Sequence, residues 1–301
     1  MPEIAFLTAD VFTDRPFGGN PLAVFPDAAG LDDKTMQIVA RELNLSETVF
    51  VLPPEQPGHT RRLRIFTPAM ELPFAGHPTV GTAVLLAETG VLDASDIVFG
   101  EGAGPVPVRI ARTAAGTTAT LTSPRPPILE APAPDRAALA RVLTLPPDAL
   151  ATVAEAGVYS AGTPFTIVPL RDEAALAAAR VDIGAWGECL AGTASPHLFV
   201  VTMADWTAGR DVRARMFAPA MGIAEDPATG AAAAALARFL IDLQHPADGR
   251  ADWIVVQGVE MGRRSTILVG ADVVAGEAAA VRIGGTAVRM SQGTFRLPDA
   301  R

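Results

Sequence analysis

The alternation of apolar and polar segments along the chain predicts a sheet-rich protein with a few helices. Short apolar runs at residues 4–12, 22–25, 48–52, 62–66, 106–110 and 118–121 are typical of strands. Residues 32–43 instead show helical spacing, with Asp32 or Asp33 suited to the N-cap. Residues 79–89, which Gly90 is expected to end, and residues 229–243 are helical patterns with almost no polar face. Because a helix that is apolar on all sides is usually buried, both should lie inside the protein.

This series of segments occurs twice, with different polar residues at matching points. The pattern R-x-F-x-P-A-M is found at residues 64–70 and again at 215–221. After each copy come a loop, a polar residue, a proline and the apolar helix, and the polar residue is His77 first and Asp226 second. Weaker matches keep the same order, pairing 20–25 with 163–168, 48–51 with 197–200, and 97–100 with 255–258. Such self-similarity indicates a duplicated structural unit.

We therefore expect an α+β fold with two pseudo-symmetric domains, each a curved, mostly antiparallel sheet wrapped around its central apolar helix. The length of 301 residues suits two domains of about 150 residues. The proline-rich segment 123–134 is the expected linker, which gives domains 1–122 and 123–301. A last strand near 281–297 could cross back to pack on the first domain.

Composition and charge exclude several classes of protein. The net charge of −9 argues against nucleic-acid binding, and no apolar run approaches the length of a membrane span. The N-terminus lacks the pattern of a signal peptide, and Cys189 is the one cysteine, so no disulfide can form within the chain. We expect a cytoplasmic protein, a homodimer, whose partner is a small molecule and neither a nucleic acid nor a membrane.

The inventory of reactive residues argues against a cofactor or metal. Lys34 is the only lysine and falls in a solvated first helical turn, which leaves no phosphate-binding lysine loop and no Schiff-base lysine. The four histidines are dispersed and show no metal-ligand spacing. The glycine-rich segment 100–104 precedes a strand, whereas a dinucleotide-binding loop precedes a helix. Cys189 itself is expected to be a buried, small apolar residue.

The starts of the two apolar helices are the best candidates for a binding site. A proline follows both His77 and Asp226 and suits the first helical position, which would place these two side chains near the N-caps. The free N–H groups of a first helical turn bind carboxylates or phosphates, and glycines at 76, 81 and 230 allow close approach. We expect a small carboxylic acid to bind between the halves. The alternative is that Asp226 only caps its helix and His77 is only packed.

Glu47 is a further candidate because it has no counterpart in the other half. It enters an apolar strand, whereas the matching position is Pro196. Desolvation would raise the pKa of such a carboxyl and suit it to acid–base chemistry. The alternative is a capping or solvated glutamate.

Six segments together resemble one known family. They are F-G-G-N-P at 17–21, N-L-S-E-T at 44–48, F-A-G-H-P-T at 74–79, E-D-P-A-T-G at 225–230, Q-G at 257–258 and M-G-R at 261–263. In this order they are similar to the phenazine-biosynthesis PhzF-like isomerases, and they span nearly the whole chain. That resemblance implies the diaminopimelate-epimerase-like fold, with two similar domains and the site between them.

The resemblance also implies a reaction and its residues. The family's catalytic glutamate, histidine and aspartate fall on Glu47, His77 and Asp226. Well-studied members move a proton within an amino- and hydroxyl-substituted cyclohexadiene carboxylic acid without a cofactor, and Glu47 would carry that proton. The expected substrate-binding residues are Asn20, Ser46, Gly76, Thr79, Thr229, Gly230 and Ala231.

One position departs from the family, and alternatives remain open. The family commonly has serine where this chain has Ala231, which leaves the substrate's identity open. Related racemases need two cysteines, so the single Cys189 excludes their mechanism. The readings that remain are a cofactor-independent isomerase, a non-catalytic ligand- or partner-binding protein, and a single-base lyase or epimerase.

Overall fold

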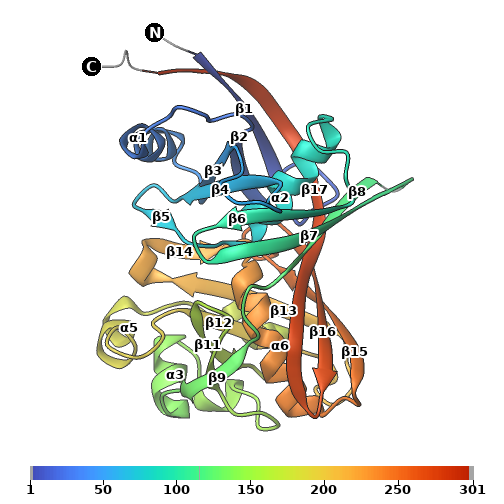
Figure 1. Cartoon of the computed structure of the whole chain (residues 1–301). Coiled ribbons are helices and arrows are strands. Elements are labelled where there is room, and N and C mark those ends of the chain that lie inside the picture. Colours follow the sequence, from blue (N-terminus) through green and yellow to red (C-terminus); the bar gives the residue numbers. More distant parts are fainter. Residues whose placement is uncertain (1–2, 115, 298–301) are drawn as a thin grey trace. The chain divides into compact units, whose positions relative to one another are not determined.

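A computed structural model describes residues 3–114 and 116–297 of the chain. The described residues divide into two compact units, one formed by those up to 124 together with those from 284 onward, and the other by residues 125–283. Both are dominated by β-sheet, so the protein has a mixed α/β fold (Figure 1). Among the described residues, no helix is long and apolar enough to cross a membrane.

The first unit is a sheet that closes through the last strand. Its elements are β1 (Glu3–Val11), β2 (Asn20–Phe25), α1 (Asp33–Leu43), β3 (Glu47–Leu52), β4 (Arg61–Phe66), β5 (Glu71–Leu72), α2 (Gly76–Glu88), β6 (Asp96–Glu101), β7 (Gly104–Thr113), β8 (Gly116–Thr122) and the end of β17 (Glu277–Arg296). The pairing runs β1–β2–β3–β4–β6–β7–β8, and β17 pairs with both β1 and β8. The pairs β2–β3 and β4–β6 are parallel, and the other pairs with a described register are antiparallel.

The second unit repeats this pairing. Its elements are β9 (Ile128–Pro132), α3 (Arg136–Val142), η1 (Pro147–Ala149), β10 (Gly157–Ser160), β11 (Pro164–Pro169), α4 (Glu173–Ala178), α5 (Ile183–Cys189), β12 (Leu198–Thr202), β13 (Asp211–Ala218), η2 (Pro219–Met221), β14 (Ile223–Asp226), α6 (Gly230–Gln244), β15 (Gly249–Gln257) and β16 (Ser265–Val274). The order is β9–β10–β11–β12–β13–β15–β16. Here β11–β12 and β13–β15 are the parallel pairs, at the places that β2–β3 and β4–β6 take in the first unit.

The two apolar helices are buried where their composition predicts. Every residue of α2 from Gly76 to Ala87 is buried, and the helix packs on β1, β2, β3, β7 and β8. Gly81 explains how closely it packs, because a Cβ atom there would lie 2.5 Å from Val11 and 2.6 Å from Leu22. The alanine-rich α6 packs on β9, β10, β11 and β16. Small side chains on both helices thus let the strands approach closely.

Several local expectations hold, and others need correction. Asp32 caps α1 by accepting a hydrogen bond from the N–H of Thr35, 2.7 Å away. The segment 123–134 is not a plain linker, because β9 lies within it and pairs with β10. The sequence patterns also missed α3, α4 and α5, which are short but begin at the capping residues Asp135, Asp172 and Asp182.

Candidate functional site

Glu47 and His77 are far apart in sequence but meet in the first unit. Glu47 is the first residue of β3, and His77 lies in the first turn of α2. Glu47 Oε2 is 3.2 Å from His77 Nε2, and the two side chains are only 13% and 5% exposed. Glu47 is therefore neither a helix cap nor a solvated surface carboxylate. The pair forms a carboxylate–imidazole contact almost shielded from solvent.

Burial keeps the His77 imidazole neutral. Desolvation lowers the pKa of His77 to about 3, although a hydrogen bond with the backbone of Pro21 acts in the opposite direction. A neutral imidazole has one N–H donor and one acceptor nitrogen. The nitrogen facing Glu47 therefore accepts or donates a proton according to its tautomer, which suits a residue that relays protons.

Two further polar contacts lead from His77 through Asn20 to Ser46, the residue just before β3. Asn20 is completely buried at the beginning of β2, and its Nδ2 lies 3.3 Å from His77 Nδ1. The hydroxyl of Ser46 donates to Asn20 Oδ1 at 3.1 Å. Asn20 and Ser46 thus hold the imidazole on the side away from Glu47. The structure brings together four of the residues that the sequence assigned to the site.

The first turn of α2 differs from the sequence expectation. The helix begins at Gly76 with Ala75 as N-cap, so His77 and the following proline lie inside the first turn and not before it. A proline is tolerated there because the N–H groups of the first turn have no intrahelical partner. Thr79 is completely buried, its N–H bonds to the carbonyl of Ala75 at 3.3 Å, and its hydroxyl contacts Ala75 and Glu101. The N–H groups of Gly76 and His77 precede this first intrahelical bond.

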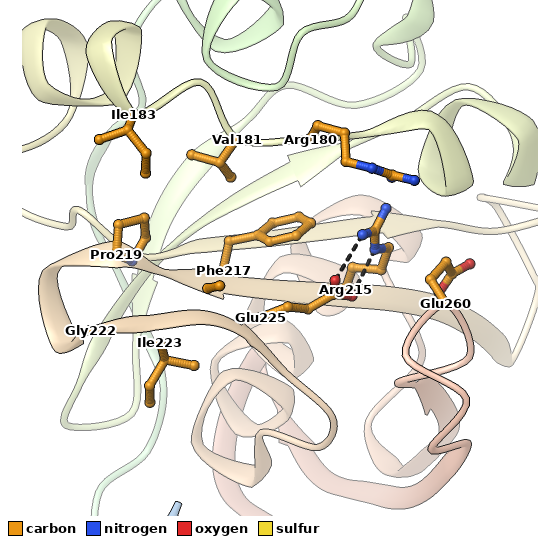
Figure 2. Close-up of a pocket in the computed structure, with 11 residues that line it drawn as sticks. Arg180, Val181, Ile183, Arg215, Phe217, Pro219, Gly222, Ile223, Glu225 and Glu260 are labelled. Carbon is orange, nitrogen blue, oxygen red and sulfur yellow. Dashed lines mark hydrogen bonds and ion pairs between the residues drawn. The ribbon is translucent and has the colours of Figure 1, made fainter. Parts of the chain in front are cut away.

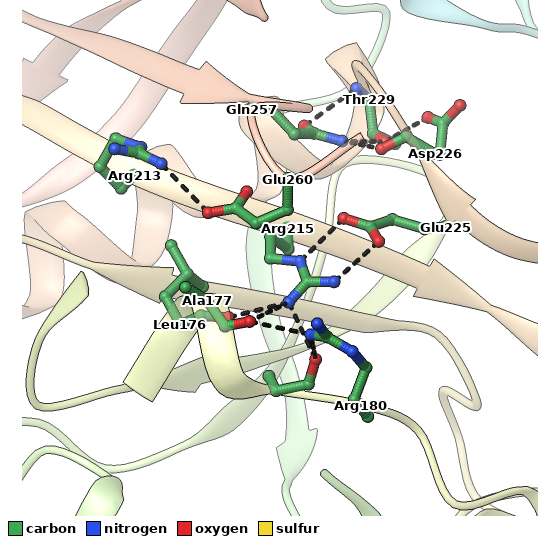
Figure 3. Close-up of polar contacts among 11 residues, drawn as sticks. Leu176, Ala177, Arg180, Arg213, Arg215, Glu225, Asp226, Thr229, Gln257 and Glu260 are labelled. Carbon is green, nitrogen blue, oxygen red and sulfur yellow. Dashed lines mark hydrogen bonds and ion pairs between the residues drawn. The ribbon is translucent and has the colours of Figure 1, made fainter. Parts of the chain in front are cut away.

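In the second unit, a buried glutamine organises the residues around Asp226 (Figure 3). Gln257, the last residue of β15, is completely buried and donates to the carbonyl of Asp226 at 2.7 Å and to the hydroxyl of Thr229 at 3.0 Å. Its Oε1 accepts from the N–H of Thr229 at 3.1 Å. The Thr229 hydroxyl also contacts Asp226 Oδ2. The Asp226 side chain is thus held at the end of β14, three residues before the N-cap Thr229 and not at the cap itself.

The loop between β14 and α6 is fixed further by its neighbours. Gly258 has φ +74°, and a Cβ there would lie 2.7 Å from the carbonyl oxygen of Pro227. Ser265 donates to the same carbonyl at 2.8 Å. Gly230 is buried at the start of α6, and Ala231 beside it is partly exposed. Pro227 therefore belongs to this braced loop and does not open the helix, which corrects the expected position of the proline.

The buried Arg215 of β13 forms an ion pair with Glu225, the residue before Asp226 on β14. Nε and Nη2 of Arg215 donate to the two carboxylate oxygens of Glu225, both at 2.8 Å, while Nη1 donates to backbone carbonyls, including that of Ala179 at 2.8 Å (Figure 3). The first unit has the same arrangement, because Arg64 makes two bonds to Glu71. The guanidinium group of each arginine also lies over the phenylalanine two residues later, 5.1 and 4.8 Å from the ring centroid. The repeated sequence pattern therefore builds a repeated structural support.

A cavity of about 630 Å³ lies in the second unit but is not the predicted site (Figure 2). Its walls come from β13, from the turn and strand that follow it, and from the segment before α5. The residues that line it are Arg180, Val181, Ile183, Arg215, Phe217, Pro219, Gly222, Ile223, Ala224, Glu225 and Glu260. Asp226, Thr229, Gly230 and Ala231 are not among them.

The remaining reactive groups have structural explanations. Cys189 is only partly buried, which corrects the expected burial; it packs beside an apolar cluster, and Arg141 Nη2 lies 3.0 Å from its Sγ. Lys34 is exposed in the first turn of α1, as expected. Segment 100–104 joins the paired strands β6 and β7, as expected. In the described ranges, no group of three or more His, Cys, Asp or Glu side chains is arranged to hold a metal ion.

Two residues that contact the candidate site, Gln257 and Glu101, were not predicted from the sequence. Gln257 lies in a segment that matches the family, yet its role as a brace for Asp226 and Thr229 depends on a contact between β15 and the start of α6. Glu101 ends β6, directly before the glycine-rich turn, and its Oε1 contacts the hydroxyl of Thr79 at 2.7 Å. The only signal for Glu101 was a lone acidic residue at the end of an apolar strand.

Comparisons with known proteins agree with this arrangement. The family model for phenazine biosynthesis-like proteins matches residues 9–293. An uncharacterized isomerase of Mesorhizobium japonicum is 41% identical over 96% of this chain and 97% of its own length. The trans-2,3-dihydro-3-hydroxyanthranilate isomerase of Pseudomonas aeruginosa is 37% identical over 96% of this chain and 98% of its own. A PhzF-family phenazine biosynthesis protein of Bacillus anthracis superposes with a TM-score of 0.88 at 26% identity, covering 98% of this chain and 100% of that one.

These matches place the chain among the isomerases built on this sheet-dominated fold. The chain belongs to the phenazine biosynthesis-like protein family.

Proposed function

We propose that this isomerase moves a proton within a small, cyclic or amino-substituted carboxylic acid, with Glu47 as the general acid and base and without a cofactor. The observation that carries the proposal is the 3.2 Å contact between Glu47 Oε2 and Nε2 of the buried His77. A carboxylate in that position can take a proton from one carbon of the substrate and return it to another. The neutral His77 would orient Glu47 and relay protons.

The proposed binding mode uses both helix starts. We propose two pseudo-symmetric domains, each wrapped around its central helix, α2 or α6, with the substrate bound at the starts of these helices. The N–H groups at Gly76 and His77 and those at Gly230 and Ala231 would bind the carboxylate at the positive helix ends. Asp226, oriented through Thr229 and Gln257, would bind the substrate's amino or hydroxyl group.

The substrate class is the finer part of the proposal. One relative is a trans-2,3-dihydro-3-hydroxyanthranilate isomerase, so this compound is the first to test. The resemblance to the family implies a serine after Thr-Gly, where this chain has Ala231, so a hydroxyl contact would be missing and a related acid would be preferred.

The test measures the transfer of deuterium from solvent into the product by proton NMR. The parent protein is compared with Glu47→Gln and with Glu42→Gln. Glu42 is an exposed glutamate on α1 and serves as a matched control for the same chemical change. We expect Glu47→Gln to lower turnover at least about a hundred-fold and to stop deuterium entering the product, while Glu42→Gln behaves as the parent protein. Normal exchange by Glu47→Gln would show that another base acts. Exchange without rearrangement would favour a single-base epimerase, and binding without exchange would favour a ligand-binding protein.

A further inference from the structure

Glu101 is a buried acid that the proposed reaction does not use directly. It is the last residue of β6 and is 9% exposed. Its Oε1 lies 2.7 Å from the hydroxyl oxygen of Thr79, and its Oε2 is buried with no hydrogen-bond partner in the described part of the chain. An ionised carboxylate rarely occupies such a place, because a buried charge without a partner is costly.

The geometry around Thr79 indicates which group carries the proton. Its hydroxyl oxygen lies 2.8 Å from the carbonyl oxygen of Ala75 and 2.7 Å from Glu101 Oε1. A hydroxyl has one hydrogen to donate, and a carbonyl oxygen can only accept. If Thr79 donates to Ala75, the second contact is a hydrogen bond only when Glu101 is protonated and donates to Thr79. Both short contacts are satisfied together only by a neutral Glu101.

The electrostatic surroundings agree with a neutral acid. Burial raises the pKa of Glu101 to about 8, and the hydrogen bond with Thr79 opposes this change. No charged neighbour is among the causes. The charged or titratable side chains on β6, on its paired strands, on α2 and next to Gly100 are Asp96, Arg61, Arg62, Arg64, Arg109, Arg112, His77, Glu88 and His59.

The contact between Glu101 and Thr79 lies at the start of α2, in the turn that contains His77. Thr79 bonds to Ala75 through both its N–H and its hydroxyl, and His77 lies within the turn that these bonds close. The turn after β6 also contacts the segment that leads into α2, because the N–H of Ala103 donates to the carbonyl of Pro73 at 2.8 Å. Ionised Glu101 would draw the Thr79 hydrogen away from Ala75 and loosen that turn.

We propose that neutral Glu101 is a positioning residue: by donating to Thr79 it holds the first turn of α2 and so keeps His77 against Glu47. The role in catalysis rests on the proposed isomerase function, whereas the protonation of Glu101 and its effect on His77 do not.

The first experiment is an NMR titration between pH 5 and pH 10 of protein labelled with ¹³C in glutamate and ¹⁵N in histidine. Glu101→Gln and His77→Gln assign the signals. We expect the Glu101 carboxyl to titrate near pH 8 and the His77 ring signals to shift with the same midpoint in the parent protein. That step in the His77 signals should be absent from Glu101→Gln. Thr79→Val should also remove the alkaline step from the His77 signals, because it removes the hydroxyl group through which Glu101 contacts the first turn of α2. A Glu101 carboxyl that is already ionised at pH 6, as its ordinary pKa of 4.5 would require, or the same alkaline step at His77 in Glu101→Gln, would overturn the proposal.

The second experiment compares turnover of trans-2,3-dihydro-3-hydroxyanthranilate at pH 7 and pH 9. Ionisation of Glu101 should lower parent turnover about tenfold between these values, and the exposed control Glu88→Gln should show the same fall. Glu101→Gln, which cannot ionise, should lack it. An equal fall in Glu101→Gln would exclude the positioning role. If the parent protein does not convert the compound at all, the proposed substrate is wrong, and the His77 titration decides the inference by itself.

Discussion

The buried Glu101 makes a specific prediction about stability and pH. Its folded-state pKa of about 8 lies above the ordinary value of 4.5, so the folded protein holds this proton more tightly than the unfolded chain does. The stabilisation is therefore complete below the unfolded pKa, declines as pH rises, and is gone once pH passes the folded pKa. The stability of the first unit should fall with rising pH across this window.

The size of the effect follows from the difference in pKa. Each pKa unit corresponds to about 1.4 kcal/mol, so the whole window is worth about 5 kcal/mol. By the linkage relation, about 3 kcal/mol of this stabilisation is lost between pH 6 and pH 9. Glu101→Gln cannot ionise and should show none of it. The difference in free energy of unfolding between the parent protein and Glu101→Gln should therefore change by about 3 kcal/mol, since other titrating groups cancel.

The assay must report the unit that contains Glu101. All three tryptophans, Trp186, Trp206 and Trp253, lie in the second unit, so their fluorescence follows residues 125–283. Hydrogen exchange of the α2 amides, read by mass spectrometry in urea, follows the first unit. The free energy of unfolding obtained from α2 exchange should differ between the parent protein and Glu101→Gln by an amount that changes with pH. The difference between the parent protein and Glu88→Gln should not change with pH. A difference that stays within about 1 kcal/mol from pH 6 to pH 9 would refute the assignment of a raised pKa.

Three further predictions concern packing, ion pairing and capping. Gly81→Ala should lower the free energy of unfolding by about 1–3 kcal/mol in urea denaturation, because its Cβ would overlap the side chains of Val11 and Leu22; an unchanged midpoint would show that these side chains move aside at little cost. Arg215→Met should lower the free energy of unfolding in urea by about 3–5 kcal/mol, because Glu225 loses its buried partner. The double variant with Glu225→Met should recover much of this loss. No recovery would mean that the hydrogen bonds of Arg215 to backbone carbonyls matter more than the ion pair. Asp32→Ala should lower the midpoint of thermal unfolding because the N-cap of α1 is lost, whereas Asp32→Ser should retain most of the cap.

Much of the local structure was predictable because it depends on neighbouring residues. The apolar character of residues 79–89 and 229–243 predicts buried helices, and α2 and α6 are buried there. The boundaries were less accurate, because the start of α2 is set by Ala75 and Thr79 and the start of α6 by the distant Gln257. The strand β9 was missed because prolines flank it, although its pairing with β10 needs only a short stretch of backbone.

For the site, the sequence alone predicted which residues carry the chemistry. The resemblance to the family implies Glu47, His77 and Asp226 as catalytic candidates, and the internal repeat singles out Glu47 as the residue without a counterpart. Composition removed lysine and paired-cysteine mechanisms, because those need residues that the chain lacks. These conclusions need no coordinates, since they depend only on residue type and order.

Only the tertiary structure decided the environment of those residues. The contact of Glu47 with His77 joins β3 to α2, the brace on Asp226 joins β14 to β15, and the contact of Glu101 with Thr79 joins β6 to α2. No spacing in the sequence encodes these distances, because strand pairing and helix packing bring the segments together. Burial then sets protonation: it keeps His77 neutral by lowering its pKa and raises that of Glu101, since a charge is costly where water is excluded.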